Sequence, residues 1–169
     1  SVNAPRGLVL ARKNGQGSNS TGIDTISWEP TTTVASAALG SMYVGDPLIA
    51  YASTSVKASP AGANDKCIGV FQGISYVNVD GEQLFRRYWE SGTSGTDIKI
   101  HISQDPNQTY FIQGDASVVA VSGVGNPKPT NVPWIVGTGS KITGNSAYIF
   151  DSSGATDAES NLRVIRRSP

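Results

Sequence analysis

The chain has 169 residues, of which 15% are charged, and its formal net charge at neutral pH is zero. A compact domain of this size buries roughly 70% of the surface that its unfolded chain exposes, so one domain with its own core is expected. The single cysteine, Cys67, excludes an internal disulfide framework, and we expect it to be a small buried residue. No segment approaches the roughly 20 apolar residues of a membrane helix, and the first residues lack the apolar run of a signal peptide. We therefore expect a soluble protein made in a reducing cytoplasm.

The charges are unevenly distributed along the chain. Three basic residues precede the first acidic residue and three follow the last one, namely Arg6, Arg12, Lys13, Arg163, Arg166 and Arg167. The stretch between them, residues 24–159, contains seven basic and thirteen acidic residues. Basic chain ends often serve as arms that reach an acidic partner, so both ends are candidates for contact with another molecule.

The first predicted element is a strand over Gly7–Ala11. Leu8, Val9 and Leu10 are costly to leave in water, so we expect this strand to add to the parent sheet or to a neighbouring subunit. A disordered terminus is the alternative. We predict an extended N-terminal arm over residues 1–20 and a single β-barrel-like domain over residues 21–169, which includes the basic C-terminal strand.

Few features of the next stretch favour helix. Thr31–Leu39 is the best helical candidate, but its β-branched threonines and lack of charge make it a poor one. Tyr43–Tyr51 predicts a strand, a Gly-Asp-Pro turn and a second strand. The Ser, Pro, Gly and Asn content of Val56–Asp65 predicts a surface loop.

The strongest local signals lie in Cys67–Asp115, which predicts four strands. Ile68, Val70, Ile74 and Tyr76 share one parity, which is typical of a half-buried strand and places Phe71 on the other face. Asp80-Gly81 tolerates the positive φ values of a tight hairpin. The alternation in Ile98–Ile102 predicts a strand with its isoleucines inward and Lys99 and His101 outward. A Gly/Pro linker is predicted over Ser122–Pro133. The other predicted strands are Thr109–Gln113, Ser117–Val121, Trp134–Val136, Ala147–Phe150 and Leu162–Arg166.

Aromatic and arginine residues are interleaved in the return strand of the hairpin. Phe85, Arg87, Tyr88 and Trp89 belong to residue types that are enriched in the hot spots of protein–protein interfaces, so we expect them to pack between subunits. An internal core strand is the rival interpretation. Stacking on single-stranded nucleic acid is a third, but the acidic body disfavours it.

The sequence carries no recognisable catalytic, cofactor or metal motif. His101 is the only histidine, and one imidazole without a second histidine or a nearby cysteine cannot build a usual zinc site. Gly137–Lys141 lacks the Walker spacing of a phosphate loop, and the aspartates lie mostly in turns that they commonly cap. We therefore expect a protein that is not an enzyme, with no cofactor and no metal. The composition favours an all-β fold, a compact β-barrel or sandwich of short strands.

Several stretches together carry a resemblance to a known family. These are GVFQGISY at 69–76, FRRYW at 85–89, DPNQTYFIQGD at 105–115, FDSSG at 150–154 and LRVIRRSP at 162–169. In this order they resemble the capsid decoration, or cement, proteins of tailed bacteriophages. The resemblance runs from about Pro5 to Pro169 and is weakest over Gly15–Leu39. It implies a compact barrel, usually trimeric, on the outer surface of the icosahedral head.

From this resemblance we expect a virion protein that binds the major capsid protein from outside and stabilises the assembled capsid, with no nucleic-acid or membrane partner. The residues expected to contact the capsid lie at the two basic ends: Pro5, Arg6, Leu8, Leu10, Arg12, Lys13, Arg163, Arg166 and Arg167. A lectin-like module that recognises glycans on the capsid or the host is the alternative. Its site would use the loop Ser122–Trp134, with Trp134 exposed beside Asn131.

Overall fold

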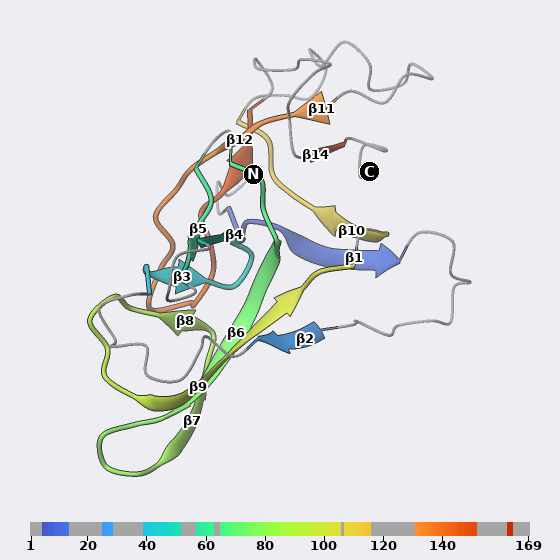
Figure 1. Ribbon diagram of the computed structural model, residues 1–169. Helices are drawn as coiled ribbons and strands as arrows, with labels where there is room; N and C mark the ends of the chain where they lie inside the picture. Colours follow the sequence, from blue (N-terminus) through green and yellow to red (C-terminus); the bar gives the residue numbers. More distant parts are fainter. Residues whose placement is uncertain are drawn as a thin grey trace.

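The computed structural model describes residues 5–13, 25–28, 39–51, 57–62, 65–105, 107–115, 131–151 and 162–163. All regular elements in these ranges are β-strands (Figure 1). The predicted all-β fold of short strands is therefore confirmed, although the strands form several small antiparallel sheets and do not close into a barrel. Within the same ranges there is no helix long and apolar enough to cross a membrane.

The strands in chain order are β1 (Val9–Lys13), β2 (Thr25–Trp28), β3 (Met42–Tyr43), β4 (Pro47–Tyr51), β5 (Lys57–Pro60), β6 (Gly69–Val77), β7 (Gln83–Arg86), β8 (Tyr88–Trp89), β9 (Thr96–Ser103), β10 (Gln108–Phe111), β11 (Asn131–Val132), β12 (Trp134–Ile135), β13 (Ile149–Phe150) and β14 (Leu162–Arg163).

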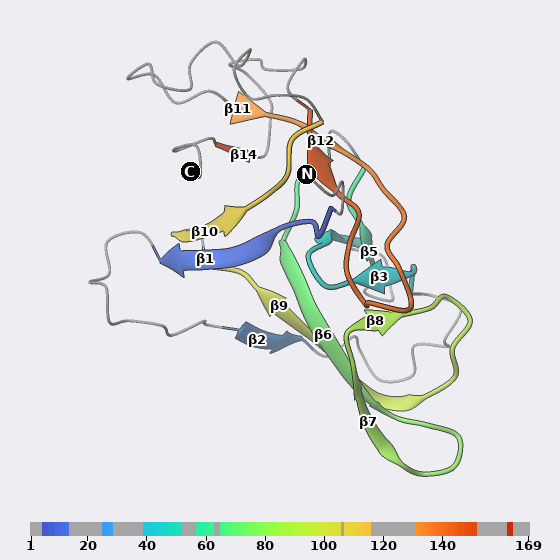
Figure 2. The ribbon, with the colours of Figure 1, turned by 180° about the vertical axis from the view of Figure 1, so that it is seen from behind.

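The largest sheet has six strands and is built around β6. Its order is β2-β9-β6-β4-β5, and β7 also pairs with β6. The pairs β4 with β6 and β6 with β7 use opposite ends of β6, so this strand contacts β4 where it begins and β7 where it ends. The other four sheets are two-stranded: β1 with β10, β3 with β8, β11 with β14 and β12 with β13. Figures 1 and 2 show the hairpin of β6 and β7 projecting at the end of the molecule opposite β11 and β14.

A β-bulge at Gln72 changes which side chains of β6 face inward. Phe71 pairs with Ile102 but Gly73 pairs with His101, so β6 has one extra residue between them. The extra residue reverses the alternation at that point, as β-bulges do. Phe71 therefore joins Ile74 in the core, whereas simple alternation had placed it on the opposite face.

The turn between β6 and β7 has the geometry that Asp80-Gly81 predicts. Gly81 has φ +83°, and its N–H donates to the Asn78 carbonyl oxygen at 3.1 Å. The Asn78 side-chain Oδ1 accepts hydrogen bonds from the backbone N–H groups of Asp80 (3.0 Å) and Glu82 (2.8 Å). An asparagine side chain that accepts hydrogen bonds from its own turn fixes the turn geometry, and with it the register between β6 and β7.

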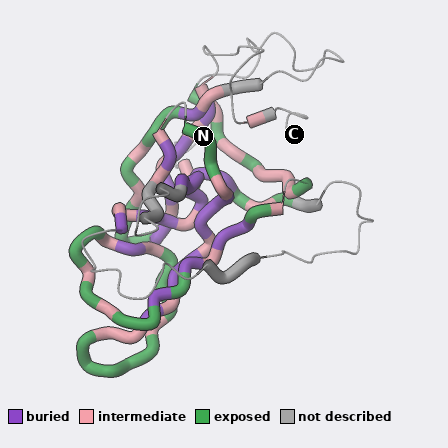
Figure 3. Tube along the Cα trace, in the orientation of Figure 1, coloured by how far each residue is buried: buried purple, intermediate pink, exposed green. Residues whose placement is uncertain are grey.

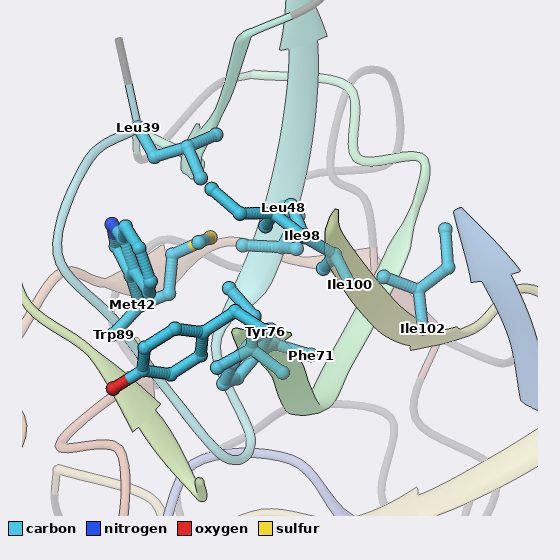
Figure 4. Close-up of a cluster of buried hydrophobic side chains, with 10 residues drawn as sticks. Leu39, Met42, Leu48, Phe71, Tyr76, Trp89, Ile98, Ile100 and Ile102 are labelled. Carbon is cyan, nitrogen blue, oxygen red and sulfur yellow. The ribbon is translucent and has the colours of Figure 1, made fainter. Parts of the chain in front are cut away.

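The main hydrophobic core lies between the inner face of this sheet and the short pair of β3 and β8 (Figure 4). Its buried members are Leu39, Met42, Leu48, Phe71, Ile74, Tyr76, Trp89, Ile98, Ile100 and Ile102. As the sequence predicts, the three isoleucines of β9 point inward while Lys99 is exposed. The exposed segments follow the hairpin of β6 and β7 and the turns around the core (Figure 3).

A second buried cluster joins distant parts of the chain and consists of Ile49, Ala61, Trp134 and Tyr148, with Leu162 packed against it. The Tyr148 hydroxyl donates to the Ala61 carbonyl oxygen at 2.6 Å, and the Trp134 indole N–H donates to the Gly62 carbonyl oxygen at 2.7 Å. Each of these aromatic rings therefore has its polar atom satisfied within the fold.

Two predictions about local structure need correction, and one strand was missed. Val56–Asp65 is not simply a loop, because β5 lies within it and pairs with β4. Cys67 is exposed rather than buried. The strand β2 was not predicted at all, and it pairs with β9. The predicted helix candidate up to residue 38, the strand over Ser117–Val121 and most of the Gly/Pro linker lie outside the described residues.

Candidate functional site

The interleaved aromatic and arginine residues split into an inward and an outward group because the chain bends after β7. β7 pairs with β6, whereas β8 pairs with β3. Trp89 is 1% exposed and belongs to the core, while Phe85 is 63% exposed. Tyr88 is half-buried, and Arg87 is exposed and donates from Nη2 to the Asn145 side-chain oxygen at 2.9 Å.

Phe85 lies on the outer face of the main sheet. Its ring centroid is 5.6 Å from that of His101, and the Ser75 hydroxyl shares a hydrogen bond of 3.1 Å with His101 Nε2. The ring also lies over the backbone of Gly73, where a Cβ atom would come within 2.5 Å of Phe85 Cζ. The predicted outward position of His101 is thus confirmed. The glycine gives Phe85 room to lie flat on the sheet, so a large apolar ring is held at the surface.

A shallow cleft lies on the other side of the same segment. Its volume is about 250 Å³, and its lining residues are Tyr76, Arg86, Tyr88, Trp89, Glu90 and Thr93. Arg86 Nη1 donates to the Tyr88 hydroxyl at 3.2 Å, and its guanidinium carbon lies 5.9 Å from the centroid of that ring. Glu90 is held from the opposite side by an ion pair with Lys141. The cleft therefore combines aromatic rings with a cation, a carboxylate and a hydroxyl group.

The N-terminal segment forms a two-stranded ribbon with β10. Val9 and Phe111 are directly opposite partners and are 42% and 48% exposed, so two apolar side chains stand next to each other on the outer face. The opposite face turns inward, since the hydroxyl of Tyr110 donates to the Ser103 hydroxyl at 3.0 Å. The sequence marks Val9 as part of an apolar strand but does not reveal its partner Phe111, because only the pairing of β1 with β10 brings the two together.

The turn after β12 carries the most exposed of these apolar side chains. Ile142 is 97% exposed, next to Lys141 with its ion pair to Glu90. The turn is held at its two ends, against β3 and against the residue between β7 and β8. Gly139 packs on the Tyr43 ring, and Gly144 packs on the Arg87 side chain. A turn fixed in this way presents Ile142 in a defined place.

The structure separates the residues predicted to contact the capsid. Arg6 is exposed, Pro5 and Leu10 are partly exposed, and Leu8 is buried against its own chain. The remaining basic residues are distributed as follows: Arg12 and Lys13 lie in β1, Arg163 lies in β14, and Arg166 and Arg167 lie outside the described residues. Leu8 is 3% exposed, and Trp89, which was predicted to pack between subunits, is 1% exposed, so neither side chain offers appreciable surface to a partner.

The predicted glycan site is wrong in one respect. Trp134 is 1% exposed and donates its indole N–H to Gly62, so it cannot stack on a ligand. Asn131 lies in β11, where it pairs with Arg163. Among the described residues, no three His, Cys, Asp or Glu side chains are grouped so as to hold a metal ion.

Comparison with known proteins adds no further constraint. The chain matches no family model, and neither a curated protein nor a solved structure matches it.

Proposed function

We propose that this protein is a non-enzymatic virion protein that binds the outer surface of an assembled phage capsid, as a trimer, and reinforces it. The structural observation that supports this proposal best is the exposed apolar pair Val9 and Phe111 on the ribbon of β1 and β10. Such a pair is suited to bury against another protein surface. Arg6 beside this ribbon adds a positive charge for an acidic partner.

The proposed mechanism is thermodynamic and requires no chemical reaction. A protein that binds only the assembled lattice stabilises it by mass action, because every bound copy must dissociate before the subunits beneath it separate. Three linked copies in a trimer make the later contacts intramolecular, so modest affinity for each copy is sufficient. Phe85, Arg87 and Tyr88 are the residues that we propose to pack between the subunits of the trimer.

The proposal is tested by electron microscopy of purified heads with and without the protein. Added density outside the lattice is the expected result, and heads that stay unchanged at saturating protein would contradict it. A double variant, Val9→Ser with Phe111→Ser, is expected to lose binding in a co-sedimentation assay. Val79→Ser is the matched control, because Val79 is an exposed valine in the distant hairpin turn.

The cleft beside Tyr88 supports a second candidate, a glycan-binding module. Aromatic rings can pack on the apolar face of a sugar, and Arg86, Glu90 and Thr93 offer hydrogen-bonding groups around it. This candidate moves the predicted glycan site from Trp134 to the cleft. Nuclear magnetic resonance titration with neutral and acidic monosaccharides separates the two functions: shifts at Arg86, Glu90 and Thr93 that Tyr88→Ala abolishes favour the module, and an absence of shifts excludes it at this cleft.

A further inference from the structure

Asp46 places a carboxyl group where water does not reach it. Its side chain is 1% exposed and lies in the turn between β3 and β4. One oxygen, Oδ2, accepts a hydrogen bond from the Tyr43 backbone N–H at 2.8 Å, but the other, Oδ1, is buried without a well-aligned hydrogen bond, although the Ser146 hydroxyl lies close enough to the carboxyl group to lower its pKa in part. A buried carboxylate oxygen that lacks a donor is destabilising, and a proton bound to that oxygen relieves the cost.

The turn that holds Asp46 is the meeting point of three segments of the chain. The Leu8 N–H donates to the Gly45 carbonyl oxygen at 2.9 Å, and the Ser146 N–H donates to the Val44 carbonyl oxygen at 2.9 Å. The packing is tight, because a Cβ atom at Gly7 would lie 2.4 Å from the Ser146 Oγ. The N-terminal segment and segment 144–148 are thus both docked on the turn that contains the buried carboxyl group.

The groups around Asp46 leave its charge poorly compensated. Burial raises its pKa from 3.8 to about 6, while the Ser146 hydroxyl and the Tyr43 N–H lower it in part. Tyr148 faces it from segment 144–148, and burial first, then the charges of Asp46 and Asp65, raise the pKa of Tyr148. In residues 5–8, the part of the N-terminal segment that docks on this turn, the charged residue is Arg6, whose side chain is exposed to solvent.

We propose that Asp46 acts as a proton-controlled lock at this junction. When its carboxyl group is protonated, the N-terminal segment and segment 144–148 stay docked on the turn between β3 and β4. When the proton is lost, opening of the junction hydrates the carboxylate, so the docked and open forms come closer in free energy. The lock acts on the segment that leads into β1 whether or not the protein binds a capsid, because it depends only on contacts within the chain.

The size of the effect follows from linkage. With a pKa of about 6 in the docked form and 3.8 in a hydrated form, the equilibrium constant for opening increases about tenfold between pH 5 and pH 8. Below pH 5 further acidification favours the docked form. Above pH 8 the carboxyl group is ionised in both forms, so no further change is expected.

Hydrogen exchange of the full chain tests the lock. The reporters are the amides of Leu8 and Ser146, corrected for the intrinsic pH dependence of exchange and compared with central amides of β6 and β9. In the wild type their protection is expected to fall about tenfold from pH 5 to pH 8. In Asp46→Asn the corrected protection is expected to be constant. In Asp80→Asn, which removes an exposed carboxyl group in the hairpin turn, it is expected to follow the wild type.

A second measurement keeps the test decisive if Asp46→Asn does not fold. The carboxyl carbon of Asp46 can be titrated directly in the wild-type protein by nuclear magnetic resonance. A midpoint near pH 6 supports the lock. A midpoint near pH 4, or reporter amides whose corrected protection does not change with pH, overturns it.

Discussion

The inner and outer faces of the main sheet present similar side chains with opposite consequences. On the inner face Tyr76 packs edge-on against Trp89, with ring centroids 5.1 Å apart, and both rings are covered. On the outer face Phe85 packs on His101 and Gly73 but remains largely exposed. An aromatic residue in a strand is therefore not evidence of a core position. What decides is whether another layer, here β3 and β8, covers that face.

The largest expected effect concerns the inner face. Trp89→Ala removes a ring that is 1% exposed and leaves a cavity among the core residues. We expect a loss of about 3–5 kcal/mol in the free energy of unfolding, measured by urea denaturation. Trp89→Phe is the control, since it keeps a ring and removes the indole N–H that has no partner. A loss below about 1 kcal/mol for the alanine variant would contradict a core role for Trp89.

Asp46 differs from the covered aromatic rings, because it is a polar side chain in a covered position. Its pKa in the folded state, about 6, lies above the unfolded value of 3.8, so the folded state binds the proton more tightly. The resulting stabilisation is fully present below pH 3.8 and is lost as the pH rises through about 6. We expect it to amount to about 3 kcal/mol. The free energy of unfolding of the wild type and of Asp46→Asn, measured by urea denaturation at several pH values, isolates this contribution. If the two free energies change with pH in parallel, Asp46 does not contribute.

The position of Phe85 on the outer face can be disturbed through the backbone beneath it. Gly73→Ala adds a Cβ atom that would lie 2.5 Å from Phe85 Cζ, at a φ of +151°. We expect a loss of about 1–2 kcal/mol in stability and displacement of the ring from His101. Chemical shifts of the Phe85 and His101 rings report that displacement. Unchanged ring shifts in a destabilised variant would mean that strain at residue 73 acts without moving Phe85.

The smallest effect on stability is expected for the exposed ring itself. Phe85→Ser changes a side chain that is 63% exposed, so the free energy of unfolding should stay within about 0.5 kcal/mol of wild type. If Phe85 packs between subunits as proposed, the variant sediments as a smaller species in analytical ultracentrifugation. A wild-type protein that sediments as a monomer removes the basis for a subunit interface at Phe85.

Much of the fold could be predicted from the central part of the sequence. Strict alternation in Ile98–Ile102 and the Asp80-Gly81 pair are local signals, and both lead to the structures that they predict. The place of Phe71 could not be predicted in the same way. A bulge depends on how two strands pair, and its extra residue carries no mark of its own in the sequence.

The candidate surfaces were predicted less well than the strands. Arg87 and Phe85 were expected to be available for contact and are exposed, but Leu8, Trp89 and Trp134 are covered. An aromatic or aliphatic side chain contributes binding free energy through its apolar surface. The same apolar surface also favours burial in the protein's own core, so residue type does not distinguish the two places. The pair of Val9 and Phe111 shows the converse, because an exposed apolar pair arises where two ordinary strand residues lie opposite each other.

The fold class, the central hairpin and the inward side of β9 follow from local sequence, because turn chemistry and the two-residue period of a strand act over a few neighbours. Contacts in the folded chain cover some aromatic rings and not others, pair the N-terminal strand with β10, and enclose Asp46 where three segments meet. Those outcomes depend on contacts between residues far apart in the chain. Their free energy comes from burial against a specific partner layer, which no local pattern specifies.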